Sequence, residues 1–327
     1  MMAANVMCLR PGGLADLPDR VHGPGMDHRS FLSSIDPATR DRLTERSDRA
    51  GLWHLSGHLA AIVLVGTLIA AAVPGWWLLL PVQGLLIIFL FTLEHEATHR
   101  TPFRTVWLND WVGRLCGVLL VLPFEWFRAF HMAHHRWTNL PGKDPELAGP
   151  KPATVRAWVW QVSGLPYWIA EARLMATLVR GRVTDGFVAE GAKGRVVAEA
   201  RAMAVIYLAA AASLVWTDVL LWVWIVPVLL GQPFLRLYLL AEHGDCPEVV
   251  NMFENTRTTF TTRAVRWLAW NMPYHVEHHV WPTVPFHRLP EVHGLMKEEL
   301  KVTANGYAGF TREYLARRPR WTESGKV

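Results

Sequence analysis

The sequence feature that most limits the fold of this chain is a set of four long apolar runs. Residues 55–73 (LSGHLAAIVLVGTLIAAAV) and 76–93 (WWLLLPVQGLLIIFLFTL) form one pair, joined by a short uncharged turn. A second pair lies between about residues 202 and 240, with Asp218 at its turn. Each run approaches the ~20 residues that a helix needs to cross a bilayer. We therefore predict an all-α integral membrane protein with four transmembrane helices in two hairpins.

The distribution of basic residues predicts the orientation of these spans. Lys and Arg are frequent in residues 100–201 and 247–327, whereas the two hairpin turns carry a single charged residue. Basic loops stay on the cytoplasmic side of a membrane. We therefore predict a multi-pass protein of the bacterial inner membrane, with both long segments, the active site and both termini facing the cytoplasm.

The chain divides into three regions by composition. Residues 1–50 are highly charged and have no apolar core, so we expect a mobile cytosolic arm rather than a signal peptide. His22 and His28 belong to this arm and are expected to be solvated. Residues 51–300 form the membrane domain, and residues 301–327 form a cytosolic tail.

One further apolar stretch, residues 105–122, carries Asp110 and Arg114 near its middle. These side chains stand four residues apart on a helix, where they can form an ion pair. We interpret the stretch as an interfacial or re-entrant helix, with a fifth span as the alternative.

Charge and cysteine usage exclude several classes of protein. The net charge of +5 belongs to the cytoplasmic loops, and no basic run interleaved with aromatic residues indicates a nucleic-acid partner. Cys8, Cys116 and Cys246 contain no CxxC pair, which argues against a disulfide framework and against a fused rubredoxin-like iron site.

Histidines carry the functional signal. Nine of the fifteen lie in four clusters, and the pattern HxxHH occurs twice. On a helix, positions i, i+3 and i+4 share one face, so each HxxHH triplet is expected to offer three nitrogens to a shared point. The candidate metal ligands are His95, His99, His131, His134, His135, His243, His275, His278 and His279.

The topology brings the four clusters together. His95 follows the second span and His243 follows the fourth, so both lie at the cytoplasmic side with the two HxxHH boxes. A catalytic zinc uses three protein ligands and a structural zinc four, so nine imidazoles predict two ions with four or five ligands each. Imidazole suits zinc, copper, iron and nickel alike. The i, i+4 pair His54 and His58 starts the first span, and we interpret it as interfacial.

Two other classes of protein remain open on the residues alone. The segment His95–His99 reads HEATH, and the pattern HExxH on a helix is typical of zinc peptidases in which the glutamate acts as general base. That pattern leaves both HxxHH boxes unexplained. The third class is a non-catalytic metal-binding or transport protein.

The boxes also resemble those of a known family. LEHEATHRTPF, FRAFHMAHHRWTNLPGKDPEL and WNMPYHVEHHVWPTVPFHRLPEVH are similar to the three histidine boxes of the integral membrane fatty acid desaturases and their hydroxylase relatives. YLLAEHGDCP resembles the segment that supplies a further histidine in that family. The resemblance covers about residues 50–295. It implies that the nine histidines bind two iron ions in a cytoplasmic helical cap.

The resemblance further implies an O2-dependent reaction on a fatty acyl chain. Reduced irons activate O2, and hydrogen is abstracted from an unactivated C–H bond. Desaturation is the expected outcome; hydroxylation, or decarboxylation to a terminal alkene, are alternatives on the same site. Electrons would come from an external donor, such as a ferredoxin with its reductase.

Other residues near the boxes are candidates for supporting roles. Some relatives have an asparagine four residues before the further histidine; Leu239 stands there in this chain, and Glu242 is the candidate replacement. The carboxylates expected to orient ligating imidazoles, or to bind metal, are Glu242, Glu96, Asp144 and Glu277. The aromatic residues expected to line the substrate cavity are Trp126, Phe127, Phe130, Tyr238 and Trp281.

Overall fold

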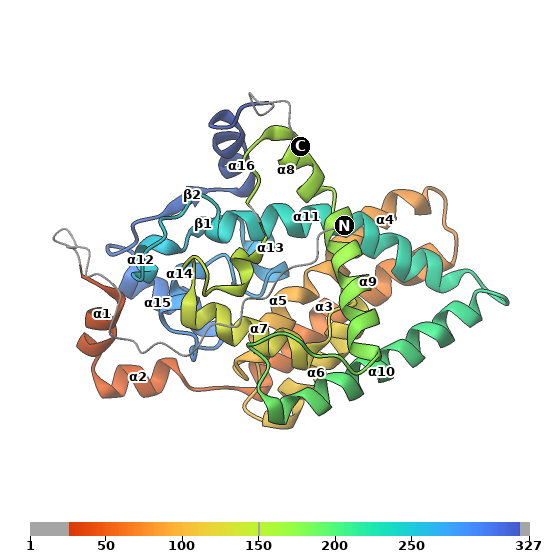
Figure 1. The fold of residues 1–327 in the computed structure, drawn as a ribbon, viewed down its shortest axis with the longest axis horizontal. Coiled ribbons are helices and arrows are strands. Elements are labelled where there is room, and N and C mark those ends of the chain that lie inside the picture. The colour runs from red at the N-terminus through yellow and green to blue at the C-terminus, as the bar shows by residue number, and fades with distance from the viewer. Residues whose placement is uncertain (1–25, 150, 321–327) are drawn as a thin grey trace.

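The computed structural model describes residues 26–149 and 151–320 and consists almost entirely of helices (Figure 1). The helices of the membrane hairpins are α3 (Asp48–Ala70), η1 (Trp76–Leu79), α4 (Leu80–Ile88), α5 (Leu90–Thr98), α10 (Glu190–Ser213), the π-helix η3 (Leu221–Ile225) and α11 (Val226–His243). The other elements are α1 (His28–Ser34), α2 (Pro37–Leu43), α6 (Val106–Leu120), α7 (Phe124–Trp137), η2 (Pro145–Ala148), α8 (Val155–Val162), α9 (Leu165–Val179), α12 (Met252–Asn255), β1 (Thr258–Phe260), α13 (Arg263–Leu268), α14 (His275–Val280), η4 (Phe286–Arg288), α15 (Leu289–Met296), β2 (Thr303–Asn305) and α16 (Tyr307–Ala316).

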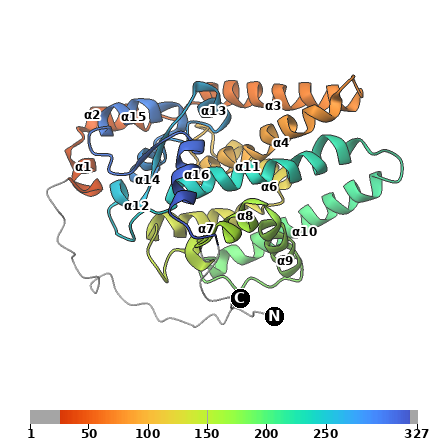
Figure 2. The same ribbon diagram turned by 90° about the horizontal axis from the view of Figure 1, so that it is seen from above.

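The all-α membrane fold predicted from the apolar runs is confirmed. Four helical segments of the described chain are long and apolar enough to cross a membrane, and they end at residues 70, 98, 213 and 243. Figure 2 shows the two hairpins, α3 with α4 and α10 with α11, extending to the right, while α12, α14 and α15 gather at the opposite end. We call this opposite end, which contains α12, α14 and α15, the cap. The second helix of each hairpin runs back towards the cap, which brings His95 and His243 to the same end.

The two hairpins touch where α4 crosses α11. A Cβ atom added to Gly84 would collide with the carbonyl oxygen of Pro227, and one added to Gly231 would collide with the carbonyl oxygen of Gly84. Small residues allow helix backbones to approach closely inside a membrane, where van der Waals packing drives association. This glycine crossing holds together the two spans, Trp76–Thr98 and Leu221–His243, that carry His95 and His243 near their cap ends.

Residues 105–137 form two helices with a sharp bend. Helices α6 and α7 meet at 102°, which is the geometry of a broken span or of a re-entrant segment. Val121 at the bend adopts a left-handed conformation (φ 61°), and Pro123 caps the start of α7. Because proline lacks an N–H and cannot continue a helix, the chain turns here and α7 passes into the cap.

The predicted ion pair between Asp110 and Arg114 is wrong. Asp110 accepts hydrogen bonds from Arg100 (3.0 and 2.9 Å) and from Arg128 (3.1 Å). Arg114 instead pairs with Glu125 and, at 3.6 Å, with Glu199. Neighbouring elements outcompete the contact along the helix because a guanidinium forms its strongest bonds in a two-pronged geometry.

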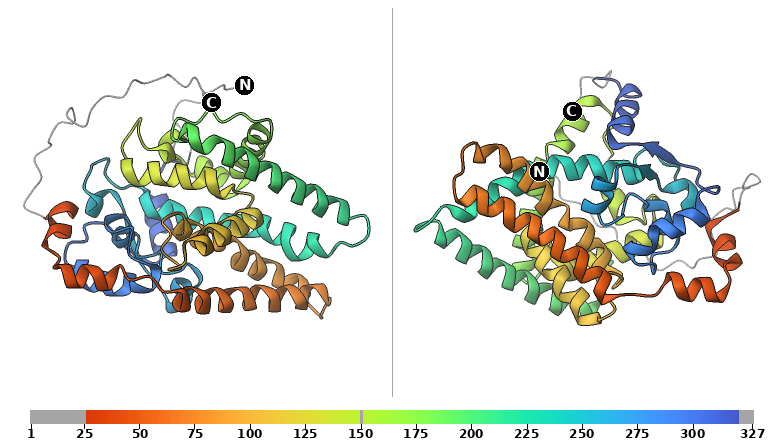
Figure 3. Two further views of the ribbon diagram at one scale, coloured as in Figure 1. Left: turned by 90° about the horizontal axis from the view of Figure 1, so that it is seen from below. Right: turned by 180° about the vertical axis from the view of Figure 1, so that it is seen from behind.

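Both ends of the described chain are packed against the cap, as Figure 3 shows for α1 and α2 beside the blue C-terminal elements. Phe31 meets Phe253 edge to face with 5.7 Å between ring centres, and Leu43 is fully buried. His28, expected to be solvated, is also buried and contacts Asn251. The predicted mobile arm therefore does not include residues 28–43; His22 lies outside the described residues.

The expected C-terminal tail also contributes to the core. Strand β2 pairs in parallel with β1, with Thr303 opposite Thr258. Helix α16 follows it and buries Phe310 and Tyr314. These contacts join residues that are distant in sequence, which a division of the chain by charge does not detect.

Candidate metal centre

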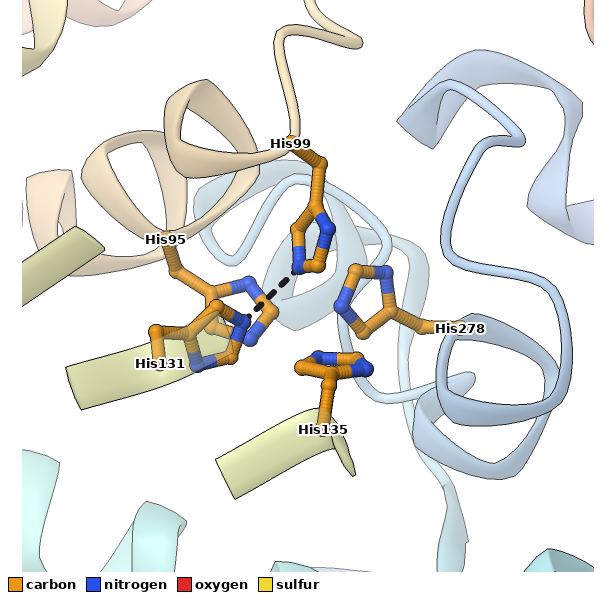
Figure 4. A group of neighbouring side chains, drawn as sticks. All are labelled: His95, His99, His131, His135 and His278. Atoms are coloured by element: carbon orange, nitrogen blue, oxygen red, sulfur yellow. Dashed lines mark hydrogen bonds between the residues drawn. The ribbon is translucent and has the colours of Figure 1, made fainter. Parts of the chain in front are cut away.

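Five of the nine histidines converge in one group, which we call the five-histidine group (Figure 4). One ligand nitrogen from each ring lies within 4.8 Å of the others. Helix α5 and its C-terminal cap contribute two of them, α7 contributes two, and α14 contributes one. The members are His95, His99, His131, His135 and His278.

The remaining four form a second, adjacent group, the four-histidine group. His134, His243 and His279 have ligand nitrogens within 4.8 Å of one another. The Nε2 atom of His275 lies 3.2 Å from that of His243 and 3.1 Å from that of His279. The rings of His135 and His279 stack at 4.2 Å between centres, which joins the two groups.

The HxxHH triplets divide between the groups, so the expectation that each converges on one point is wrong. In α7, His131 and His135 belong to the five-histidine group and His134 to the other. In α14 the i+3 residue, His278, joins the five-histidine group, while the i and i+4 residues lie in the other. Successive residues rotate by about 100° around a helix, so positions i+3 and i+4 diverge enough to reach two centres.

Distances between facing nitrogens match those of ligands on a common ion. The Nε2 atoms of His99 and His131 are 2.8 Å apart, and those of His134 and His243 are 3.2 Å apart. Two nitrogens that each lie 2.0–2.1 Å from a metal are separated by about 2.8–3.4 Å in octahedral or tetrahedral geometry. The side chains are thus arranged as ligand sets.

Unpaired nitrogens give an independent test of whether metal fits. His135 and His278 each have both ring nitrogens buried without a hydrogen-bond partner, and Nδ1 of His95 is in the same state. Burial, and then the neighbouring histidines, lower the pKa of His275 and His279 well below its usual range. Neutral imidazoles therefore turn lone pairs towards one another, and cations at the two centres would satisfy them. The donor set fits metal ions.

Three of the four predicted carboxylates lie against histidines of the two groups. Both carboxylate oxygens of Asp144 are 3.0 Å from Nδ1 of His134. Glu96 lies 3.4 Å from Nδ1 of His278. Glu242 lies 3.3 Å from Nδ1 of His275. Carboxylates in such positions fix the orientation and tautomer of a ligating imidazole.

The fourth predicted carboxylate has a different role. Glu277 is fully buried and contacts Nδ1 of His293 at 2.5 Å and Thr258 at 2.6 Å. None of these partners belongs to either histidine group. Glu277 points away because its position between His275 and His278 lies on the opposite side of α14.

Sequence reasoning missed three outer contacts. Glu146 lies 3.0 Å from Nδ1 of His134, the carbonyl oxygen of Asn255 lies 3.2 Å from Nδ1 of His243, and Thr138 Oγ1 lies 3.2 Å from Nδ1 of His279. Glu146 was detectable, because it follows Asp144 by two residues. No local pattern points to the backbone oxygen of Asn255.

A cavity of about 260 Å³ opens beside both groups. Its walls include Trp126, Phe127 and Phe130, three of the aromatic residues expected around a substrate, together with Leu239 and Glu242. Tyr238 and Trp281, also predicted to line it, are not among its lining residues. Tyr238 packs between Phe89 and Tyr307, with 5.2 and 5.1 Å between ring centres, and Trp281 is buried in the main core.

The fold and the site together define a helical membrane protein whose cap holds two adjacent histidine groups suited to metal, beside a cavity with an aromatic wall. The chain belongs to the fatty acid desaturase family, whose sequence model matches residues 74–310.

Three relatives illustrate this membership. An sn-1 oleoyl-lipid 12-desaturase of Picosynechococcus sp. is 34% identical over 34% of this chain and 35% of its own length. An sn-1 acyl-lipid omega-3 desaturase (ferredoxin) of Nostoc sp. is 32% identical over 24% of this chain and 23% of its own. A sphingolipid delta(4)-desaturase/C4-monooxygenase of Mus musculus is 26% identical over 75% of each chain. The matched segments thus span about a third and a quarter of the first two relatives.

Proposed function

We propose that the protein is a membrane lipid desaturase that uses two iron ions and O2 to convert a CH2–CH2 unit of a fatty acyl chain into a double bond. The observation that carries this proposal is the opening of one cavity onto both histidine groups: its lining includes His95 and His131 from one group and His134, His243 and His275 from the other. The desaturase names of the three relatives support the same reaction.

The proposed reaction balances with two electrons. The acyl chain loses two hydrogens, and O2 with two electrons and two protons leaves as two molecules of water. The iron ions, when bound, would supply the capacity to reduce O2 and to oxidise an unactivated C–H bond. Everything else in the reaction depends on how the protein holds the ions and the chain.

The residues of this chain supply orientation and exclusion of water. Asp144 accepts a hydrogen bond from Nδ1–H of His134, which directs the Nε2 lone pair of that ring towards its centre. Glu96 and Glu242 stand beside Nδ1 of His278 and His275 for the same purpose. The aromatic wall would align the acyl chain, and errors of about 1 Å in such alignment can cost ~100-fold in rate.

Product analysis tests the proposed function. The purified protein, reconstituted with a reductase, ferredoxin, O2 and acyl substrates, is expected to contain about two irons per chain and to release an alkene of unchanged carbon number. A hydroxylated chain would identify a hydroxylase, and a terminal alkene with one carbon fewer would identify a decarboxylase. A single zinc with no iron-dependent product would contradict the proposal and favour a peptidase.

We also propose that the protein spans the inner membrane of a bacterial cell several times and that its cap faces the cytoplasm. The basic residues of the cap segments support this orientation. A cysteine introduced at Gly186, between α9 and α10, should resist a membrane-impermeant maleimide in intact cells. A cysteine introduced at Asp218, in the turn of the second hairpin, should react. The reverse pattern would contradict the orientation.

An external, acidic electron donor is the remaining part of the proposal. The chain carries a formal net charge of +5, and a basic surface attracts an acidic carrier such as a ferredoxin. With the donor well below saturation, turnover should fall as ionic strength rises from about 0.05 to about 0.5 M, because the Debye length shrinks to a few ångströms. A rate unaffected by salt would contradict electrostatic docking.

A further inference from the structure

Helix α11 carries a cation in the wall of the proposed substrate cavity. Arg236 lines this cavity, and its guanidinium carbon lies 4.5 Å from the centre of the Tyr167 ring on α9. Its Nε atom is buried without a hydrogen-bond partner. Within residues 26–149 and 151–320, the carboxyl groups of Glu171, Glu146 and Glu242 act on this charge from beyond ion-pair distance. A charged group inside a membrane protein is costly unless it meets a counter-ion or a cavity.

A second hollow meets the cavity at this arginine. The hollow has a volume of about 200 Å³ and is lined by Lys151, Gln161 and the cap end of α11. Arg236, Glu146, Leu239 and His243 line both spaces. Lys151 donates to Asn139 Oδ1 (2.7 Å) and to the carbonyl oxygen of His243 (3.1 Å), and the third N–H donor of its ammonium remains for a ligand.

Three carboxyl groups lie near Arg236, and negative charge on them would repel an anion. Glu146 and Glu242 face histidines of the metal centre, His134 and His275 respectively. Glu171 lines the cavity with Oε2 buried and unpartnered. Burial, only partly offset by Arg236, raises the pKa of Glu171 to about 8. A protonated carboxyl group can donate a hydrogen bond to an anion rather than repel it.

We propose that Arg236, with Lys151 in the adjoining hollow, binds the anionic head of the acyl substrate, a carboxylate or a phosphate. Guanidinium groups are suited to this role because their planar fork matches both anions. Arg236 lies seven residues, or about 10 Å along the helix axis, before His243. The subsite therefore fixes the start of the acyl chain relative to the metal centre, and the enzyme selects the reacting carbon by its distance from the head.

The anion subsite rests on the proposed function, but measurements of binding test it without turnover. The affinity of the iron-loaded enzyme in detergent is measured by calorimetry for stearate and for its uncharged methyl ester. The parent protein should bind stearate about 10- to 100-fold more tightly, which is the effect of a hydrogen bond to a charged group. Arg236→Gln should lose this preference, while its affinity for methyl stearate stays within about twofold.

Two further variants separate the role of the charge from folding. Arg236→Lys keeps the charge without the fork and should retain a smaller preference for stearate. Arg180→Gln removes an exposed arginine of the same region, bonded only to its own helix through Ala176, and should keep the full preference. Equal affinity of the parent for acid and ester would overturn the proposal, as would an unchanged preference in Arg236→Gln.

Lipids of different charge identify the source of the anion. Tighter binding of stearate than of phosphatidylglycerol would assign a free carboxylate, and the reverse order would assign a lipid phosphate. Equally tight binding of a neutral galactolipid would overturn the subsite. A parent protein that shows no anion preference but desaturates normally would refute only the subsite. A parent protein that keeps the preference but forms no alkene would refute only the proposed reaction.

Discussion

His278→Ala is expected to remove most of the bound iron and to abolish turnover. His278 is fully buried in the five-histidine group that it completes, and its Nδ1 lies 3.4 Å from Glu96. Within the described residues, neither ring nitrogen has a hydrogen-bond partner. Loss of an outer partner of a metal ligand already costs ~10- to 100-fold in affinity or activity, so loss of the ligand itself should exceed about 100-fold. Iron per folded chain and the rate of product formation measure the effect.

His134→Ala tests the four-histidine group in the same way. It should deplete iron comparably, because His134 faces His243 in that group and is held by Asp144. His287→Ala provides the control, since His287 belongs to neither group, and should leave iron within about twofold of the parent. Full iron loading of His278→Ala would refute the assignment of the third histidine box.

Glu242→Gln is expected to weaken iron retention or to slow turnover by about 10- to 100-fold. Glu242 is buried at the end of α11, lines the cavity and lies 3.3 Å from Nδ1 of His275. The substitution keeps the shape of the side chain and removes its charge. An amide accepts a weaker hydrogen bond than a carboxylate, so the imidazole becomes a poorer donor to the metal.

Glu277→Gln is the matched comparison. This carboxylate lies inside the third histidine box, between His275 and His278, but it contacts His293 rather than a histidine of either group. Its substitution should affect iron content by less than about twofold. If Glu242→Gln also left both iron content and turnover within twofold of the parent, Glu242 would have no part in the metal centre.

The sequence was sufficient to find the four spans and the histidines that the structure brings together, because both depend on local patterns. Apolar runs of membrane length identify α3 and α11 directly, and HxxHH identifies helix faces rich in imidazole. The division of each triplet between two groups was not predictable from spacing alone. It depends on how tertiary packing arranges α5, α7 and α14 around the histidines.

The cavity and the packed ends required the structure. Tyr238 is aromatic and close to His243, yet it faces Phe89 rather than the cavity. Arg236 contacts Tyr167 across 69 residues of sequence, and no motif joins these two positions. His58, interpreted as interfacial, is fully buried and accepts a hydrogen bond from Trp270. Such contacts arise between elements whose order in the chain gives no indication of proximity.

At the glycine crossing of α4 and α11, a small rotation would displace the distant ends of both spans by a larger amount. Gly84 lies 11 residues before His95, and Gly231 lies 12 residues before His243, so the two arms measure about 16 and 18 Å. A rotation of about 5° about this crossing would move the histidine at the end of either arm by about 1.5 Å. This displacement exceeds the ~1 Å that separates good from poor alignment in catalysis. Backbone contact without intervening side chains leaves little freedom for such rotation, so two residues remote from the chemistry maintain the alignment of the ligands.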